Sequence, residues 1–306
     1  MKLELNEHST PFNLESTLTC GQLFRWEKVG SWWLGIAQHQ AFKVRQTDNI
    51  LEFEGTNTDF IKNYFRLDDD LQRIVSEINR DTWTKQAVQT FYGLRLARQD
   101  PWECLVSYMC ATFKNILAIK GIILNLARRF GSEFAFEGQS FYTFPKPKAL
   151  AKATLSELRM CKLGFRARRV RETARIVDCN KIGLEDLKAV DYETAKHRLL
   201  QLPGVGNKVA DCILLFSLEK LEAFPVDIWM KKVIQRYYSN HFDELFIHKI
   251  LDKKTLSAKE YSAISAFARN YFGRYAGYAQ EYLYHFVRAQ NSKDLRQEQS
   301  PDQPLP

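Results

Sequence analysis

The chain of 306 residues lacks several features that mark common protein classes. No apolar run approaches the ~20 residues that a membrane-spanning helix needs, and the first ten residues lack the basic and then apolar pattern of a signal peptide. The six cysteines are scattered, and no two of them form a Cys-x-x-Cys motif for zinc or an iron–sulfur cluster. No cysteine follows Cys212. These absences predict reduced thiols, no required cofactor, no membrane partner and a cytoplasmic protein, nucleoid-associated if the source is bacterial.

The charge of the chain has a clear sign. Lys and Arg number 44 against 36 Asp and Glu, which gives a formal net charge of +8. This balance favours a polyanionic partner, although many basic proteins bind no nucleic acid. The length is sufficient for one large core or for two to three smaller ones.

The order of sequence patterns predicts an α+β protein. Residues 1 to about 55 are rich in aromatic and β-branched residues, with turn signals at 30–31, 38–40 and 48–49, so we expect a twisted antiparallel sheet. Helical patterns follow at about 58–65 and 71–79 and continue from Trp83. We expect a sheet domain with helices over 1–98, a helical core over 99–290 and a disordered, polar and Pro-rich tail over 291–306. Within the core, helices are expected at 102–112, 115–130, 149–160, 166–176, 192–200, 207–216, 228–238, 257–272 and 277–289.

One stretch of the core, LLQLPGVGNKVADCILLF at 199–216, predicts two helices joined by a tight turn over 202–206. Gly204 and Gly206 are expected to supply backbone conformations that a Cβ would hinder. The second helix starts at Asn207, and its N-terminus carries free N–H groups and partial positive charge, which suit a DNA phosphate. This is a helix-hairpin-helix, an element that grips the DNA backbone without reading its sequence.

A lysine and an aspartate near this hairpin suggest chemistry. Lys208 and Cys212 are four residues apart and share a helix face, and partial burial at the mouth of the hairpin favours a neutral, nucleophilic amine. Asp227 comes nineteen residues after the lysine (227 − 208 = 19) and precedes another apolar helix. Such a pair suits attack at a sugar C1′, where positive charge develops. The residues alone leave two other interpretations open, because Lys208 could touch only phosphate and Asp227 could be an ordinary N-cap.

The hairpin, Lys208 and Pro225-Val226-Asp227 at this spacing closely resemble the helix-hairpin-helix DNA glycosylases that have a Gly/Pro-rich loop and an aspartate, and most of all their 8-oxoguanine DNA glycosylase/lyase branch. The resemblance extends to about residue 290 and includes Cys20-Gly21-Gln22-Leu23-Phe24-Arg25-Trp26. It implies an N-terminal antiparallel sheet before a helical core of two subdomains. It also implies a monomeric, bifunctional repair enzyme that excises 8-oxoguanine opposite cytosine from duplex DNA through a lysine Schiff base and then nicks the strand by β-elimination.

The resemblance further implies a pocket for the flipped base. The carbonyl of Gly21 would accept a hydrogen bond from the N7–H that only the oxidised base has, so normal guanine would leave a buried acceptor unpaired. Gln280 would read the Watson–Crick edge, Tyr284 would stack on the base, Cys212 would face its other side, and Pro225 would line the pocket. Taken alone, each of these residues has an ordinary structural interpretation.

The resemblance also implies a DNA-opening surface. Phe165 would wedge at the lesion, Arg166 would contact the orphaned cytosine, and Arg168 would continue a basic strip whose alternative interpretation is a solvated helix face. Gly204, Gly206 and Asn207 would bind phosphate at the hairpin.

The chain departs from the animal-type pattern of the family in several places, and one of them is an arginine that helps to read the opposite cytosine. Phe113, Lys114 and Asn115 stand where that form has three asparagines that fill the vacated stack, Ala118 replaces an arginine and Trp229 replaces a histidine. We therefore expect looser discrimination of the base opposite the lesion.

Two further points complete the expectations. By resemblance, the backbone carbonyls of Leu200, Leu202 and Val205 would hold a structural monovalent or divalent cation in the hairpin. The alternatives are a monofunctional glycosylase for other damaged bases, whose known forms lack a lysine at position 208, and a non-catalytic DNA-binding protein, which has no need for Asp227 or the Gly21 segment.

Overall fold

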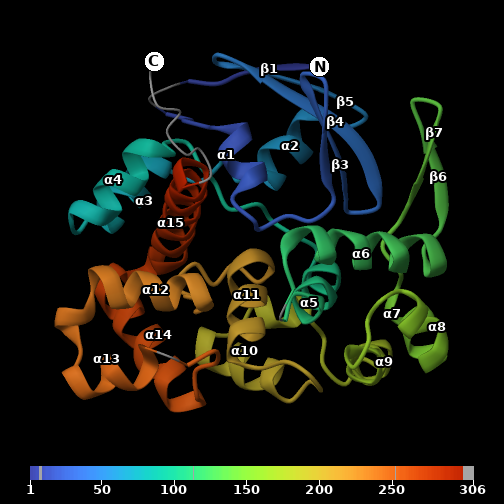
Figure 1. Cartoon of the computed structure of the whole chain (residues 1–306). Helices are drawn as coiled ribbons and strands as arrows, with labels where there is room; N and C mark the ends of the chain where they lie inside the picture. Colours follow the sequence, from blue (N-terminus) through green and yellow to red (C-terminus); the bar gives the residue numbers. More distant parts are fainter. Residues whose placement is uncertain (7–8, 113, 252, 299–306) are drawn as a thin grey trace, which may run out of the picture.

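The computed structural model describes residues 1–6, 9–112, 114–251 and 253–298. An antiparallel sheet lies over one side of a larger group of helices (Figure 1). The strands are β1 (Lys2–Glu4), β2 (Trp26–Val29), β3 (Trp32–Ala37), β4 (Gln40–Thr47), β5 (Ile50–Glu54), β6 (Glu133–Phe136) and β7 (Gln139–Tyr142). The α-helices are α1 (Leu14–Thr19), α2 (Thr58–Tyr64), α3 (Leu71–Ile78), α4 (Thr82–Thr90), α5 (Pro101–Cys110), α6 (Ile116–Phe130), α7 (Pro147–Lys152), α8 (Leu155–Met160), α9 (Arg166–Asp178), α10 (Tyr192–Leu200), α11 (Asn207–Ser217), α12 (Ile228–Tyr237), α13 (Glu244–Leu251), α14 (Ala258–Phe272) and α15 (Ala276–Glu298).

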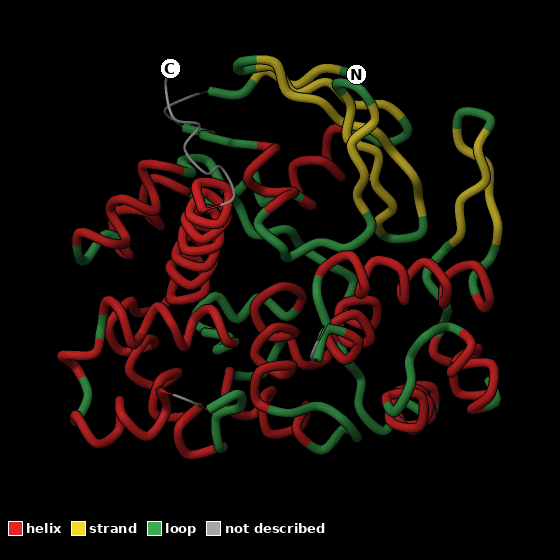
Figure 2. Tube along the Cα trace, viewed as in Figure 1, coloured by secondary structure: helices red, strands yellow, loops and turns green. Residues whose placement is uncertain are grey.

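The N-terminal sheet has the strand order β1-β5-β4-β3-β2, and every neighbouring pair is antiparallel. Val44 pairs with Trp33 on one side and with Phe53 on the other, so apolar side chains meet on one face of the sheet. Helices α1 and α2 contribute Leu18 and Ile61 to the same buried cluster. The expected antiparallel sheet followed by a helical core is confirmed (Figure 2).

Helices α3 and α4 pack away from the sheet. Their buried residues Ile74, Ile78 and Val88 belong to the hydrophobic cluster of the helical core, and α15 contacts both helices. Helix α15 therefore joins the helical core to the segment that follows the sheet, and it carries four of the site residues described below.

Several elements differ from the sequence expectations. Helix α1 lies within the stretch read as strands, and Asn13 begins it by accepting the Ser16 N–H at 2.8 Å. The helix expected over 149–160 is two helices, because Thr154 forms a capping box with Glu157 and starts α8. The hairpin of β6 and β7 was not predicted. Its turn uses Glu137 and Gly138, both with positive φ, as two-residue hairpin turns require.

The tail also differs from its expectation. Helix α15 continues to Glu298, so residues 291–298 are helical rather than disordered. The segment Asn291 to Glu298 contains no Gly or Pro, and Lys, Leu, Arg, Gln and Glu are good helix formers. The expectation for 299–306 lies outside the described residues. No described helix combines the length and the apolar character that crossing a bilayer requires.

Candidate active site and DNA-binding surface

The predicted helix-hairpin-helix is formed by α10, the turn after it and α11. Gly204 has φ +87°, and a Cβ there would lie 2.9 Å from side-chain atoms of Arg169, so a glycine is required. Gly206 differs from the expectation. It is extended, with φ −102° and ψ 180°, and a Cβ there would meet open space. The turn needs only its first glycine for its shape, because the chain is already extended where α11 begins.

Gly206 nevertheless leaves the start of α11 without a side-chain cap. It is the exposed N-cap residue and makes no side-chain capping bond, so no capping side chain occupies the first N–H groups of α11. The turn is fixed to α9, because the hydroxyl of Thr173 donates to the carbonyl of Pro203 at 2.9 Å. This arrangement suits an anion such as a DNA phosphate.

Lys208 lies in the first turn of α11 and is half-buried. Its Nζ is 4.9 Å from the ring centre of Tyr108 in α5, and that ring stacks on Phe216. Cys212, one turn along α11, is buried, and burial raises the pKa of its thiol to about 12, opposed by the nearby Lys208. Cys212 is therefore a neutral, soft surface beside the amine.

Asp227 is the N-cap of α12. Its Oδ1 accepts the N–H groups of Trp229 and Met230, each at 2.9 Å. Burial raises the pKa of the Asp227 carboxyl above its ordinary value, and Lys208 and the two N–H donors oppose the rise. The capping interpretation is thus correct, and it coexists with an electrostatic interaction between Asp227 and Lys208.

A buried hydrogen-bond network joins the two elements that carry this pair. Asp211 in α11 accepts hydrogen bonds from the hydroxyl of Tyr192 at 2.7 Å and from the hydroxyl of Tyr261 at 2.6 Å. The Tyr261 oxygen in turn accepts the N–H of Val226 at 3.2 Å. The residue before Asp227 is therefore fixed to the helix that holds Lys208.

Two of the predicted base-pocket residues, Gly21 after α1 and Tyr284 in α15, lie close together. Gly21 has φ +113°, and a Cβ there would lie 2.9 Å from Nη1 of Arg288 and 3.3 Å from Cε1 of Tyr284. Arg288 donates from Nη1 to the carbonyl of Cys20 at 2.7 Å, and its guanidinium lies 5.1 Å from the Tyr284 ring centre. The structure thus brings Gly21 and Tyr284 together although 263 positions separate them (284 − 21 = 263).

Gln280 and Pro225 are both buried. The side-chain oxygen of Gln280 has no hydrogen-bond partner within the described residues, which is unusual for a buried amide. A buried acceptor left open in this way suits a ligand that brings a donor.

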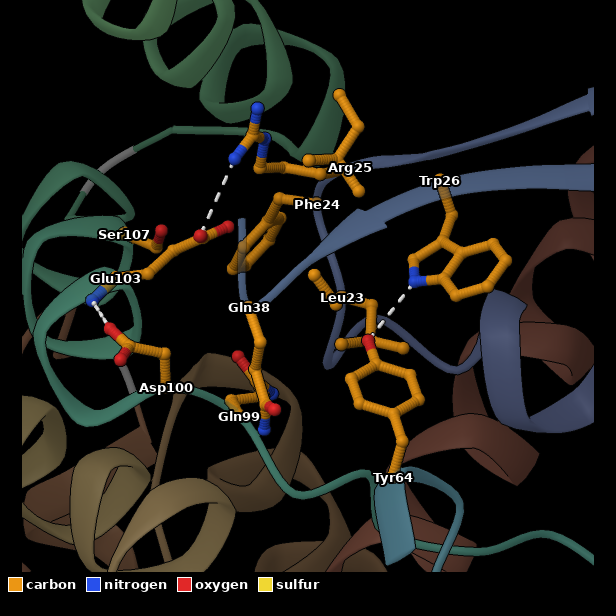
Figure 3. A pocket seen from close by; sticks show the side chains of 12 residues that line it. Leu23, Phe24, Arg25, Trp26, Gln38, Tyr64, Gln99, Asp100, Glu103 and Ser107 are labelled. Carbon is orange, nitrogen blue, oxygen red and sulfur yellow. Dashed lines mark hydrogen bonds and ion pairs between the residues drawn. The ribbon is translucent and has the colours of Figure 1, made fainter. Parts of the chain in front are cut away.

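Hydrogen bonds of the neighbouring Gln22 hold the Gly21 segment in place. Gln22 donates to the carbonyl of Arg95 at 2.8 Å and accepts the Ala97 N–H at 2.8 Å. Arg25 pairs with Glu103 of α5 at 3.4 Å, beside a cavity of about 30 Å³ (Figure 3). Burial raises the pKa of Glu103 to about 7. This cavity has room for a water-sized molecule and not for a base.

The expected DNA-opening residues lie at the start of α9. Phe165 is 63 % exposed, as a wedge requires. Arg166, by contrast, is buried. Its guanidinium lies 4.3 Å from the Phe165 ring centre and donates a hydrogen bond to the carbonyl of Thr112. Arg168 is exposed and pairs with Glu172 at 2.8 Å.

The segment before α6 is exposed at Lys114 and Asn115. Asn115 is the N-cap of α6, and its side chain accepts the Ala118 N–H at 2.8 Å. Its side-chain oxygen therefore already has a partner within the protein. Phe113 lies outside the described residues.

The three carbonyls expected to hold a cation lie at the end of α10 and in the turn. The Leu202 carbonyl accepts the Val205 N–H at 3.1 Å, so one of the three already has a partner. Val205 and Leu202 are buried, and Leu200 is 40 % exposed. Carbonyl oxygens are the donors that hard cations prefer.

Two residues at the site escaped sequence reasoning. Tyr108, under Lys208, was read as part of an apolar helix, and its position depends on how α5 packs on α11. Glu281, beside Gln280, is buried, which only its contacts in the fold reveal. The signal in the sequence was a glutamate within a largely apolar stretch of α15.

The fold and the hairpin define a class of protein that acts on DNA. Residues 109–251 match the HhH-GPD superfamily of base excision DNA repair proteins, and residues 4–105 match the N-terminal domain of 8-oxoguanine DNA glycosylase. A 3-methyladenine DNA glycosylase from Archaeoglobus fulgidus shares the fold, with a TM-score of 0.71 at 22 % identity.

Closer matches fix the family. The N-glycosylase/DNA lyase of Saccharomyces cerevisiae is 30 % identical over 92 % of this chain and 85 % of its own length. A structure of Clostridium acetobutylicum 8-oxoguanine glycosylase/lyase, with duplex DNA containing cytosine opposite 8-oxoguanine, has a TM-score of 0.82 at 30 % identity, over 95 % of this chain and 98 % of that one. The chain belongs to the 8-oxoguanine DNA glycosylase family within the HhH-GPD superfamily.

Proposed function

We propose that this protein is a bifunctional glycosylase/lyase that excises 8-oxoguanine opposite cytosine from duplex DNA and then nicks the strand. The observation that carries the proposal is the electrostatic interaction of Lys208 with the buried carboxyl of Asp227. Two further features support it: the buried amide oxygen of Gln280 has no partner within the described residues, and Gly21 packs closely against Tyr284. The protein acts as a monomer on DNA that contains the oxidised base.

The proposed base recognition uses two complementary contacts. The carbonyl of Gly21 accepts the N7–H of 8-oxoguanine, whereas guanine presents a lone pair there and leaves two acceptors facing each other. The open oxygen of Gln280 accepts a donor from the Watson–Crick edge. Tyr284 stacks on one face of the base, Cys212 contacts the other, and Pro225 completes the wall.

In the proposed chemistry, Lys208 Nζ attacks C1′ while the bond from C1′ to the base breaks, and the departing base takes the bonding electron pair. Asp227 stabilises the positive charge that develops on the sugar. One amine proton passes to the departing base, and the C1′–O4′ bond then opens with protonation of the ring oxygen, which turns the adduct into a protonated Schiff base. This Schiff base makes the C2′ proton acidic. Loss of that proton expels the oxygen on C3′ and cuts the strand.

The proposed DNA contacts come from two places. Phosphate binds the open start of α11 at Gly204, Gly206 and Asn207, and a structural cation on the carbonyls of the turn would reinforce that site. Phe165 wedges into the stack, and Arg166 must leave its contact with Thr112 to reach the orphaned base.

The test is borohydride trapping on duplex DNA carrying 8-oxoguanine opposite cytosine. We expect a covalent adduct with damaged DNA only and none with Lys208→Gln, which should still bind DNA. Lys62→Gln, an exposed lysine of α2, is the matched control and should trap normally.

Two outcomes would contradict the proposal. Normal turnover by Lys208→Gln would refute the lysine as nucleophile. Tight binding by the wild type without an adduct would point to a monofunctional glycosylase or a binding protein, and an assay of free-base release separates those two.

A further inference from the structure

A buried aspartate lies close along the helix that carries the proposed nucleophile. Asp211 in α11 comes three residues after Lys208 and is fully buried, and a buried carboxyl needs hydrogen-bond partners. Its Oδ2 accepts a hydrogen bond from the Lys196 ammonium at 3.0 Å and another from the Tyr261 hydroxyl at 2.6 Å. Its Oδ1 accepts one from the Tyr192 hydroxyl at 2.7 Å. Both oxygens are therefore used, and the carboxyl group is a fixed anchor within the core.

One of these donors also reaches the segment that leads into α12. The Tyr261 oxygen accepts the N–H of Val226 at 3.2 Å, while its own hydrogen goes to Asp211. Val226 is buried, and the preceding Pro225 has no N–H, so this bond holds the main chain immediately before Asp227. The Tyr261 hydroxyl is therefore a bridge between α11 and the residue next to Asp227.

The two sides of this bridge differ in how firmly they are held. In α11 every residue from Val209 to Ser217 is buried, so packing fixes this helix. Residues 223–227 form neither helix nor strand, so individual hydrogen bonds have a larger part in holding them. Tyr261 itself lies in the first turn of α14, which begins with a capping box. Loss of the hydroxyl would therefore move the segment before α12 rather than α11 or α14.

From this geometry we propose that Tyr261 is a positioning residue that sets where the Asp227 carboxyl lies relative to Lys208. Its hydroxyl acts through the main chain of Val226. The charge of Asp227 stabilises a sugar cation only from the correct place, and a misplacement of about 1 Å can cost about a hundredfold in rate. This inference rests on the proposed function and adds a residue from another helix on which that function depends.

The experiment compares Tyr261→Phe with Tyr192→Phe. Each variant keeps an aromatic ring and removes one buried hydroxyl that donates to Asp211. The Tyr261 hydroxyl also accepts from Val226, whereas the Tyr192 hydroxyl accepts from Lys196 at 2.7 Å. The variants are therefore matched in the bond to the anchor and differ in the bond to the Asp227 segment.

The single-turnover rate of 8-oxoguanine release is measured together with DNA affinity and melting temperature. We expect similar losses in melting temperature and unchanged DNA affinity for the two variants. Tyr261→Phe should release the base about tenfold to a hundredfold more slowly than wild type. Tyr192→Phe should release it at a rate close to that of wild type, because the Asp227 segment keeps its hydrogen bond.

A second substrate identifies the group that moves. On duplex DNA with a preformed abasic site, the Lys208 amine adds to the free aldehyde and water leaves. No base departs in this reaction, so no sugar cation has to be stabilised by Asp227. Borohydride trapping of Tyr261→Phe on this DNA should therefore match wild type, which assigns the defect to Asp227 and not to the amine.

The hydrogen bond itself can be measured without a variant. Main-chain N–H groups that are buried and hydrogen-bonded exchange slowly with solvent. The Val226 amide of wild type should therefore be protected in hydrogen exchange. This measurement tests the bridge even if Tyr261→Phe does not fold.

The outcomes separate the two proposals. Equal slowing by the two phenylalanine variants, or no slowing by Tyr261→Phe, overturns the inference, because the network would then contribute stability alone. An equal loss by Tyr261→Phe on damaged and on abasic DNA also overturns it, and so does rapid exchange of the Val226 amide. A wild type that forms no adduct on 8-oxoguanine DNA overturns the proposed function, and this inference with it.

Discussion

Asp227 has two roles that substitution can separate. Its Oδ1 caps α12 through two hydrogen bonds at 2.9 Å, and its charge is proposed to stabilise the sugar cation. Asparagine retains an oxygen that can cap and loses the charge, whereas alanine loses both. The pair Asp227→Asn and Asp227→Ala therefore tests the cap and the charge independently.

The size of the capping effect follows from the structure. Loss of an N-cap costs about 1 kcal/mol. Both variants lack the charge, so their difference isolates the cap. We expect Asp227→Asn to be more stable than Asp227→Ala by about 1 kcal/mol, or about 2 °C in melting temperature for a chain of this length.

The sign of the pH dependence follows from burial. The pKa of Asp227 is raised in the folded protein, so its contribution to stability is present below the unfolded pKa and is lost as pH rises through the folded pKa. Wild type and Asp227→Asn should therefore be closest at acidic pH, and wild type should lose stability relative to the variant as pH rises.

Thermal unfolding and borohydride trapping together decide the question. Neither variant should form the adduct, and both should bind DNA. Equal melting temperatures for the asparagine and alanine variants would refute the assigned cap. An adduct formed by Asp227→Asn at the wild-type rate would refute the need for the charge.

Three other predictions address the walls of the site. Excision measured against each of the four opposite bases should vary within about tenfold, since an arginine contact worth about 1–3 kcal/mol is replaced by Ala118; strong selectivity for cytosine would contradict this. Gly21→Ala should lose about 1–3 kcal/mol of stability, because φ is +113° and the new methyl would approach Arg288 and Tyr284. Gly21→Ala should also release 8-oxoguanine more slowly than wild type even when it binds DNA equally well. A variant that melts and excises like wild type would show that the Gly21 segment is placed differently. Burial raises the pKa of Glu103 to about 7, so wild type should lose stability relative to Glu103→Gln as pH rises towards that value in thermal melts; parallel curves would show that Glu103 is already ionised beside Arg25.

Local signals in the sequence were sufficient for much of the fold. Asp100-Pro101 starts α5, and the predicted start of α11 at Asn207 is confirmed. The capping box at Thr154 was equally readable, yet the apolar pattern across it suggested one helix instead of two. Local chemistry fixes where helices begin, and continuity of pattern is a weaker guide.

The site was only partly predictable, for a physical reason. Lys208 and Cys212 share a helix face by spacing alone. Gly21 and Tyr284 meet through the packing of α15 against the Cys20 segment, and only the resemblance placed both residues in one pocket. Glu281 is buried by the way α15 packs in the fold, and a lone glutamate in a largely apolar stretch is too weak a signal to reveal that burial.

Helix α15 has a consequence for how this family can diverge. The same helix carries the proposed base-pocket residues Gln280 and Tyr284 and packs against α3 and α4, the two helices that follow the sheet in sequence. A substitution in α15 that reshapes the pocket is therefore also expected to disturb the packing of α15 against α3 and α4. We therefore expect members of this family to change lesion preference more easily through substitutions in the loops that line the site, at the Cys20 segment or before α12, than through substitutions in α15.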